Sequence, residues 1–401
     1  MIRQKNSKFI KFGIAGLAIL MILGGYGYWA LHRPLPYLRP QQTSPNIVVT
    51  APAGSLTWPK TGQQAIGLVD GGTLQTHGKQ TPVPTASTAK LITALMVLRD
   101  KPVGLGQTGP TITLTASDVA LYQKYAAQNG SVVRVVAGEK ISEYQMLQAL
   151  MLPSANNVAD SLAVWAYGSL PAYAKAANSY LATLNLQNTH VGSDASGLDP
   201  STTSTASDLV LIGQLAMQNP VLAQIVGQKT ATIPVAGKIK NVNFLLGTNH
   251  IVGIKTGNSD QAGGVFVSAV SITLNGDPRT LVIAYAGAPS LYDAVAGSLP
   301  MIQSAQTNFK TVTFVKKNTV IGHYKLPWGG SVAAVVSSDL NFQTWAGTEV
   351  GAQIGLGTIP ATSKEGQIIG SVATRGKSVE IKLAKTIPAP SAWWRLTHPF
   401  N

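Results

Sequence analysis

A lysine opens a helical segment that is otherwise almost wholly apolar. After Lys90 the run Leu91–Leu98 carries aliphatic residues on every side of the expected helix, and Pro102 follows shortly after its end. Proline cannot continue a helix, so the segment stops there. A helix that is apolar all round belongs in a protein core rather than on a surface. Any fold of this chain must therefore place an amine at the edge of its core.

A serine precedes this lysine by three residues. Ser87 and Lys90 lie on one face of the expected helix. An amine in apolar surroundings loses pKa, and a neutral lysine can take the proton of a neighbouring serine hydroxyl. The alternative is structural: Ser87 caps the helix and Lys90 extends its amine to water. Ser-x-x-Lys is common by chance, so the rest of the chain has to decide between the two.

The composition excludes several classes of function. The 401 residues carry a formal charge of +14, but the basic residues form no dense stripe with interleaved aromatics. Nucleic-acid binding is therefore not expected, whereas an anionic polymer or a lipid surface suits the charge. There is no cysteine, and the six histidines are scattered without ligand spacing. We predict no metal site and no cofactor.

The N-terminal region has the pattern of a membrane anchor. Residues 12–31 contain no charge and follow four basic residues. Twenty residues are enough to span a hydrocarbon core, and the basic flank favours the cytoplasm. We predict a transmembrane signal anchor at 12–31, with 1–11 in the cytoplasm and the remainder outside the cytoplasm. A cleaved signal peptide is the alternative, with Gly25-Tyr26-Gly27 as a poor cleavage site.

The remainder divides by composition into a linker, two domains and a tail. Prolines at 32–54 indicate an extended Pro-rich linker. Residues 55–310 have strand patterns at both ends and helical patterns between them, which predicts one α+β domain whose sheet pairs distant strands. Short alternating strands at 311–390 predict a small all-β domain. The tail, 391–401, carries Trp393-Trp394, which suits either a membrane surface or a buried position.

Two further motifs accompany the serine and lysine. Ser154 and Asn156 lie in a loop between two helical patterns, where an N-cap is the ordinary explanation. Lys255-Thr256-Gly257 ends an apolar strand, where a lysine is usually just solvated. Each is weak alone. In the order Ser-x-x-Lys, Ser-x-Asn, Lys-Thr-Gly, they form the signature of serine penicillin-recognising enzymes.

The chain resembles one branch of these enzymes, the D-alanyl-D-alanine carboxypeptidases or low-molecular-weight penicillin-binding proteins. The resemblance covers about residues 55–310 and extends to the β domain that follows. It implies a penicillin-binding-protein or β-lactamase-like domain, with an antiparallel sheet and a helical cluster, and then a small all-β sandwich. The stretches that carry it, beside the three motifs, are Gly138–Lys140, Leu150–Ala159, Asn188–His190, Ser196–Asp199, Ser204–Leu209, Gly253–Gly263 and Leu326–Gly329.

The resemblance also implies roles for individual residues. Ser87 would be the nucleophile, Lys90 its base, and Ser154 the donor of a proton to the leaving amine. Substrate-binding groups would be Asn156, Lys255, Thr256, Gly257 and Asn258, with backbone N–H groups of Ser87 and Asn258 forming the oxyanion hole. The implied reaction removes the terminal D-alanine from peptidoglycan stem peptides ending in D-Ala-D-Ala, and β-lactam antibiotics would acylate the same serine.

Other activities on this scaffold remain open. A β-lactamase of the commonest class needs a glutamate for deacylation, and the chain has none between Glu143 and Glu349. A D,D-endopeptidase, a transpeptidase or an inactive cell-wall-binding protein is also compatible with the motifs. Relatives often carry an arginine for the substrate carboxylate after the strand that follows Lys-Thr-Gly. Residues 287–293 contain no basic residue, and the sequence does not say where Arg279 lies.

Overall fold

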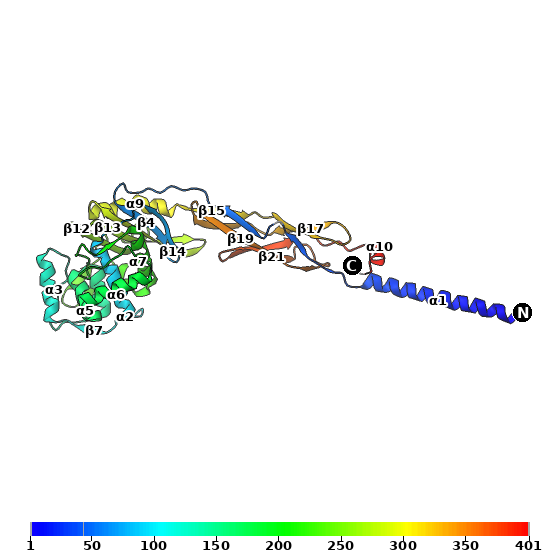
Figure 1. Ribbon diagram of the computed structural model, residues 1–401, viewed down its shortest axis with the longest axis horizontal. Coiled ribbons are helices and arrows are strands. Elements are labelled where there is room, and N and C mark those ends of the chain that lie inside the picture. Colours follow the sequence, from blue (N-terminus) through cyan, green and yellow to red (C-terminus); the bar gives the residue numbers. More distant parts are fainter. Residues whose placement is uncertain (1, 43, 400–401) are drawn as a thin grey trace. The chain divides into compact units, whose positions relative to one another are not determined.

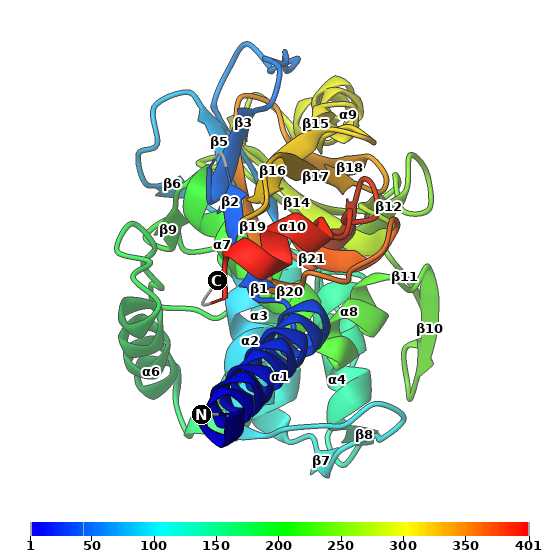
Figure 2. The same cartoon turned by 90° about the vertical axis from the view of Figure 1, so that its right-hand side faces the viewer.

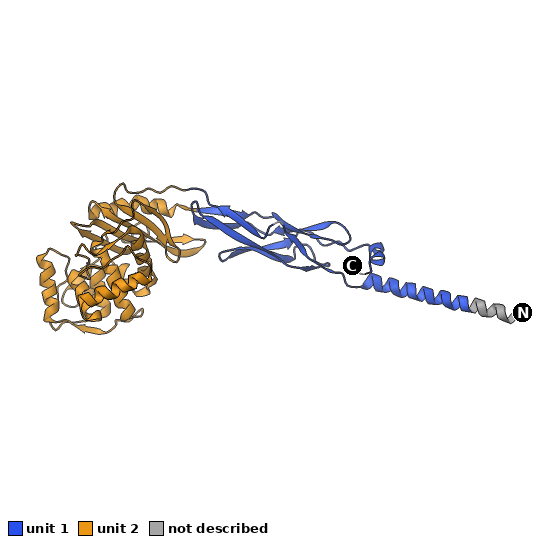
Figure 3. Cartoon of the chain, in the orientation of Figure 1, with its two compact units in different colours: residues 1–53, 310–401 blue, residues 54–309 orange. Residues whose placement is uncertain are grey.

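The computed structural model describes residues 2–42 and 44–399. Met1, Thr43, Phe400 and Asn401 lie outside the described residues, so the predicted segments that contain them are described without them. The chain forms two compact units, one of residues 54–309 and one that joins 1–53 to 310–401 (Figure 3).

A five-stranded antiparallel sheet forms the centre of the 54–309 unit. Its strand order is β12-β13-β14-β4-β5, so strands from the two ends of the unit meet at β14 and β4. The sequence-based expectation of a sheet that pairs distant strands is confirmed. The strands are β12 (Ile251–Ser259), β13 (Gly263–Leu274), β14 (Asp277–Ala288), β4 (Gln63–Leu68) and β5 (Gly72–His77).

Helices cover both faces of this sheet (Figure 1). Helix α9 (Leu291–Gln306) packs on one face and α7 (Ala206–Gln218) on the other. At Gly213 of α7, an added Cβ would lie 2.7 Å from the Val282 side chain and 3.0 Å from that of Val267. The missing side chain therefore lets the helix approach the sheet closely. With both faces covered, the strands bury apolar residues on each side.

A cluster of helices beyond α7 carries most of the remaining core. A 3₁₀ turn, η1 (Ala86–Ala89), leads directly into α2 (Lys90–Asp100), the helix expected from the apolar run. Helix α4 begins at a capping box of Ser142 and Gln145, the local signal for a helix start. The other helices are α3 (Ala116–Ala127), α4 (Glu143–Met151), α5 (Asn156–Tyr167), α6 (Leu170–Thr183) and α8 (Pro220–Val226). The short strands of this unit form three pairs, β6 (Val83–Pro84) with β9 (Thr203–Ser204), β7 (Thr111–Thr113) with β8 (Lys140–Ser142), and β10 (Thr230–Ile233) with β11 (Gly237–Lys240).

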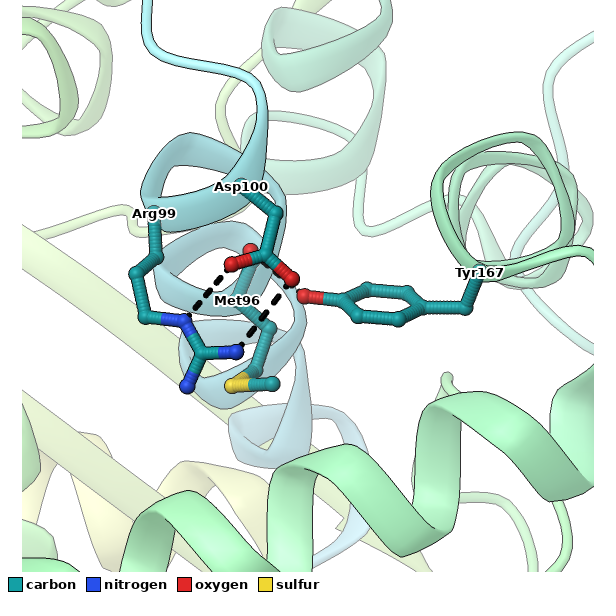
Figure 4. Close-up of polar contacts among 4 residues, drawn as sticks. All are labelled: Met96, Arg99, Asp100 and Tyr167. Atoms are coloured by element: carbon teal, nitrogen blue, oxygen red, sulfur yellow. Dashed lines mark hydrogen bonds and ion pairs between the residues drawn. The ribbon is translucent and has the colours of Figure 1, made fainter.

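The far end of α2 is tied to the end of α5 (Figure 4). The Tyr167 hydroxyl donates a hydrogen bond of 2.8 Å to the Met96 carbonyl. Arg99 and Asp100 form an ion pair of 2.7 Å on the exposed side of the same turn, where such pairs contribute little. The hydrogen bond from Tyr167 therefore fixes α2 against α5. The other ends of these two helices hold the candidate site.

The second unit is built on a seven-stranded sheet of order β2-β16-β17-β22-β21-β19-β3. Its core is apolar and includes Tyr324, Val372 and Ile381. The strands from the C-terminal part are β15 (Phe309–Val315), β16 (Val320–Lys325), β17 (Ser331–Val336), β18 (Leu340–Trp345), β19 (Glu349–Leu356), β20 (Ile359–Pro360), β21 (Ile368–Thr374) and β22 (Lys377–Leu383). The expected second β domain is present.

The N-terminal part of this unit corrects the expectation of a linker at 32–54. Strands β1 (Tyr37–Leu38), β2 (Pro40–Gln42) and β3 (Asn46–Thr50) pair with β20, β16 and β19 respectively. Strands β2 and β3 are the two edges of the large sheet. Edge strands tolerate proline because one side of the backbone needs no ladder partner. Pro40 opens the edge strand β2, and the other prolines of this segment lie outside the strands.

The C-terminal end of the first helix and the C-terminal helix contact each other within the same unit (Figure 2). Helix α1 (Ile2–His32) contacts the C-terminal helix α10 (Ala392–Thr397), and the Tyr26 hydroxyl donates to the Leu396 carbonyl at 2.5 Å. The paired tryptophans have opposite environments. Trp394 is buried edge-on against Trp328, whereas Trp393 is 74% exposed.

Candidate active site

The turn that carries Ser87 lies directly against the edge strand β12. An added Cβ at Gly257 would lie 2.8 Å from the Thr85 carbonyl oxygen and 3.2 Å from the Ser87 nitrogen. A side chain at this position would therefore collide with the backbone of η1. Glycine in Lys-Thr-Gly is what allows the strand and the turn to touch.

Lys90 lies behind Ser87 with its amine fully enclosed. Its Nζ is 2.7 Å from Ser87 Oγ, 2.7 Å from Asn156 Oδ1 and 2.9 Å from the Ser196 carbonyl oxygen. The side chain has no solvent exposure. The expected pairing of Ser87 with Lys90 is thus present in the geometry, and the alternative in which Lys90 extends to water is not.

These three contacts define how a neutral Lys90 is oriented. A neutral amine has two N–H groups and one lone pair. The amide oxygen of Asn156 and the carbonyl of Ser196 can only accept hydrogen bonds. Both N–H groups are therefore used on them, and the lone pair is left facing the Ser87 hydroxyl. The arrangement is suited to removing the serine proton.

Charge and burial around Lys90 favour the neutral amine. Burial is the largest influence and holds the pKa of Lys90 well below its usual value, and the positive charge of Lys255 lowers it further. Asp194 and Asp160 raise the pKa, but less. The net direction is the one that a general base needs near neutral pH.

Ser154 and Lys255 form a second hydroxyl–amine pair. Lys255 Nζ donates to Ser154 Oγ at 2.8 Å and to the Thr256 carbonyl at 3.1 Å. Burial lowers the pKa of Lys255 to about 7. Ser154 has a positive φ of 67°, a conformation that costs free energy for a residue other than glycine. Such conformations occur disproportionately at functional sites.

A cavity of about 690 Å³ opens over these groups. Six of the eight residues predicted from the sequence line it, and Lys90 and Lys255 lie behind its wall. The predicted residues in the lining are Ser87, Ser154, Asn156, Thr256, Gly257 and Asn258. The structure therefore brings residues from η1, the α4–α5 loop, α5 and β12 to one cavity.

Two parts of the site were not assigned roles from the sequence. The segment 128–131 after α3 forms one side of the cavity. The turn at 194–199 supplies the Ser196 carbonyl to Lys90, and Gly197 packs so closely that an added Cβ would lie 2.1 Å from the Ala86 carbonyl oxygen. In the sequence, Ser196–Asp199 is identified only as a stretch that resembles the family. No role is predicted there, because the group that contacts Lys90 is a backbone carbonyl and any residue type carries one.

Arg279 is not part of this cavity. Arg279 pairs with Ile272 near the turn that begins β14. The position of β14 level with Thr256 is Tyr285, six residues further along the strand, because Tyr285 pairs with Phe266 and Phe266 pairs with Thr256. The lining includes no arginine or lysine, and its one charged residue is Asp260. Among the described residues, no group of three or more histidine, aspartate or glutamate side chains is placed to hold a metal.

Comparison with known proteins places this geometry in a family. Residues 64–283 match the peptidase S11 family, D-alanyl-D-alanine carboxypeptidase. A Mycobacterium tuberculosis D-alanyl-D-alanine carboxypeptidase is 33% identical over 61% of this chain and 84% of its own length. A Pseudomonas aeruginosa D-alanyl-D-alanine endopeptidase is 31% identical over 50% of this chain and 63% of its own. The crystal structure of penicillin-binding protein 5 from Haemophilus influenzae has the same fold, with a TM-score of 0.57 at 22% identity over 84% of this chain and 100% of that one. The chain therefore belongs to the D-alanyl-D-alanine carboxypeptidase family of peptidases.

Proposed function

We propose that this protein is a serine-type D-Ala-D-Ala carboxypeptidase that acts on peptidoglycan stem peptides through an acyl-enzyme. The observation that carries the proposal is the buried contact of 2.7 Å between Lys90 Nζ and Ser87 Oγ, with the other two Lys90 contacts going to acceptors. Since penicillin-type β-lactams offer a reactive carbonyl to the same serine, we propose that they are covalent inhibitors.

Acylation begins at Ser87. Its hydroxyl proton passes to the lone pair of Lys90 as Oγ attacks the carbonyl of the terminal D-Ala–D-Ala bond. The negative charge that develops on the carbonyl oxygen is stabilised by backbone N–H groups of Ser87 and Asn258. Loss of one such donor typically costs about 2.7–4 kcal/mol of transition-state stabilisation.

Ser154 completes the first half of the reaction. It donates its proton to the nitrogen of the leaving D-alanine and recovers one from Lys255, whose amine is 2.8 Å away. Breaking the C–N bond releases D-alanine and leaves the acyl group on Ser87. Lys90 then gives up the proton it took and Lys255 regains one, so both amines return to their starting states. Water attacks the ester, with its proton passing through Lys90 to Ser87 Oγ and its hydroxide joining the acyl group, which restores the Ser87 hydroxyl and releases the shortened peptide.

Substrate binding uses the groups on the cavity wall. Asn156 holds the peptide amide and Lys90, while Thr256 and Lys255 bind the terminal carboxylate. The backbone of Gly257 and Asn258 borders the scissile bond. The lining offers no arginine for the carboxylate. Recognition of the carboxylate therefore depends on Lys255 and Thr256.

That same lining favours one alternative, a D,D-endopeptidase. A site with little positive charge at its mouth discriminates weakly between a free terminal D-alanine and one linked to another peptide. A relative named as an endopeptidase is 31% identical over half of this chain. Comparing hydrolysis of a D-Ala-D-Ala peptide with that of a cross-linked muropeptide separates the two activities.

The test is a covalent label followed by product analysis. We expect benzylpenicillin to add one stable mass increment to the full-length protein in detergent, on Ser87, and the enzyme to release D-alanine from a D-Ala-D-Ala peptide. Ser87→Ala should lose both. Labelling that persists in Ser87→Ala would contradict the nucleophile assignment. An adduct that clears within seconds would favour a β-lactamase, and no adduct would favour a binding protein without turnover.

We further propose that α1 anchors the enzyme in the membrane as a single pass, with the peptidase on the cell-wall side. Lys11–His32 of this helix is long and apolar enough to span a bilayer. Tyr26 lies near the end of that span and contacts α10, so the exposed Trp393 is positioned to reach the lipid interface. Protease protection of the full-length protein in right-side-out vesicles tests the orientation.

A further inference from the structure

Two buried carboxylates lie beyond Lys90 and are not used in the mechanism above. Asp160 on α5 has no solvent exposure, and Asp194 in the loop after α6 is 8% exposed. Burying an ionised carboxylate is costly unless hydrogen bonds or opposite charges compensate it. Their presence beside a catalytic lysine calls for an explanation.

Both carboxylates bind the backbone of one tight turn, residues 194–199. Asp160 Oδ1 accepts from the Ala195 N–H at 3.0 Å. Asp194 Oδ1 accepts from the N–H groups of Ser196 at 2.8 Å and Gly197 at 2.6 Å, and its Oδ2 accepts from Asp199 N–H at 2.6 Å. The turn is thus held from both sides by negatively charged groups.

This turn is what presents the Ser196 carbonyl to Lys90, at 2.9 Å. From α2, Thr93 Oγ1 donates to the Ala195 carbonyl at 2.6 Å, so the peptide groups on both sides of Ala195 are fixed. A fixed Ser196 carbonyl keeps one Lys90 N–H occupied, and this keeps the lone pair of the neutral amine directed at Ser87.

Asp160 is itself oriented by its surroundings. The Tyr125 hydroxyl on α3 donates to Asp160 Oδ2 at 2.6 Å, and Tyr125 is buried. Asp160 lies one helical turn after Asn156, so both face the same side of α5. One face of this helix therefore contacts Lys90 directly through Asn156 and indirectly through the turn.

We propose that Asp160 and Asp194 are positioning residues for Lys90: they hold the turn that presents the Ser196 carbonyl, and their negative charges oppose the loss of its proton. The inference rests on the proposed function, in which Lys90 is the base. According to this inference, the two carboxylates help to set the pH below which Lys90 is protonated and acylation of Ser87 slows. Without them, burial and Lys255 would drive Lys90 neutral at still lower pH.

The charged and titratable groups around Lys90 define the sign of the effect. Lys255 on β12 lowers the pKa of Lys90, and the two carboxylates raise it. Burial raises the pKa of Asp160, while the hydrogen bonds from Tyr125 and the Ala195 N–H, and to a smaller extent the charge of Lys124, oppose that rise. Tyr173 on α6 is buried next to Thr93 and stays protonated because burial raises its pKa. Removing one carboxylate charge therefore lowers the pKa of Lys90.

The experiment measures the pKa of Lys90 and the acylation rate separately in the full-length protein in detergent. The pKa comes from NMR titration of lysine labelled with ¹³C at Cε, and the rate from benzylpenicillin acylation against pH. Asp160→Asn keeps the shape and the acceptor for Ala195. We expect it to lower the pKa of Lys90 and to move the acidic limb of the acylation profile to lower pH by the same amount.

A matched control separates charge from structure. Asp208→Asn removes another buried carboxylate of the same unit, which accepts from Thr189 and is not among the groups that shift Lys90. It should leave both midpoints unchanged. Asp194→Asn should act in the same direction as Asp160→Asn, and it decides the question if Asp160→Asn does not fold.

Each outcome has a defined meaning. An unchanged Lys90 pKa in Asp160→Asn and Asp194→Asn would overturn the inference, as would a loss of rate or stability with the midpoints in place. A lowered Lys90 pKa together with an unmoved acylation profile would support the inference and contradict the proposed role of Lys90 as base.

Discussion

The two units of the molecule differ in what they bury. Among residues whose side chains the structure describes, every buried lysine, aspartate and glutamate belongs to the 54–309 unit: Lys90, Glu139, Glu143, Asp160, Asp194, Asp208 and Lys255. In the β unit, the described buried polar side chains are the hydroxyls of Thr344, Ser363 and Thr374. One interior is apolar, and the other holds charge.

The difference shows which unit gives up stability in order to bury ionisable groups. Taking an ion out of water costs several kcal/mol, and a partner only partly compensates for it. The β unit, whose described interior is apolar, does not accept that cost. The peptidase unit accepts it around Lys90 and Lys255, where burial gives amines the lowered pKa that the proposed reaction needs.

The strongest test of this contrast is to remove the buried amine itself. Lys90→Ala should slow acylation of Ser87 by benzylpenicillin by about 10²–10⁴-fold, because the serine loses its base. Lys79→Ala, at an exposed lysine of the same unit, is the control and should acylate normally. Stopped-flow kinetics measure both rates. Normal acylation by Lys90→Ala would mean that its burial serves the fold alone.

Removing the second amine should have a smaller and more selective effect. Lys255→Ala should lower kcat/KM for a D-Ala-D-Ala peptide by about 10- to 100-fold, because a charge-assisted hydrogen bond to the carboxylate is lost. It should also move the acidic limb of acylation to higher pH, since Lys255 lowers the pKa of Lys90. A peptide ending in D-alanine amide is the comparison substrate. Equal losses on both substrates would count against carboxylate binding.

Glu143 offers a buried charge without catalytic contact. Both its carboxylate oxygens are buried without a hydrogen-bond partner in the described structure, and burial raises its pKa to about 7. Between about pH 4.5 and 7 the unfolded chain therefore releases a proton that the folded chain retains, and stability falls as pH rises. Above that range the cost reaches about 3 kcal/mol.

Replacing Glu143 by glutamine should remove this pH dependence. Urea unfolding of Glu143→Gln and the wild type should diverge progressively from pH 5 to pH 8, with the variant more stable at the higher pH. Acylation measured at pH 7 should be little changed. A difference in stability that stays constant across this range would show that the carboxyl group does not titrate in the folded protein.

The smallest effect on chemistry is expected from the apolar unit. Ile381 is fully buried in the β core, and Ile381→Ala should destabilise that unit by about 2–5 kcal/mol. The acylation rate below its melting temperature should equal that of the wild type. Calorimetry and acylation on the same sample make the comparison. A parallel fall in acylation would show that the two units are coupled.

Much of the fold followed from sequence pattern. The apolar run after Lys90 predicted α2, because apolar periodicity is a local property of the chain. The prolines at 32–54 misled because they fall at the start of β2 or outside the short strands, a pattern that a linker shares, and only the pairing of β2 with β16 and of β3 with β19 reveals the strands. The opposite environments of Trp393 and Trp394 likewise depend on Trp328, 65 and 66 positions earlier.

What the sequence by itself determined is the set of side chains that meet at the candidate site, because their order and spacing form three local motifs. The tertiary structure decided the environment that makes them reactive. Full burial of Lys90, its contact with the Ser196 carbonyl and the close approach of Gly257 to Ser87 all join residues far apart in the chain. Burial and charge set a pKa, and both are properties of the folded core.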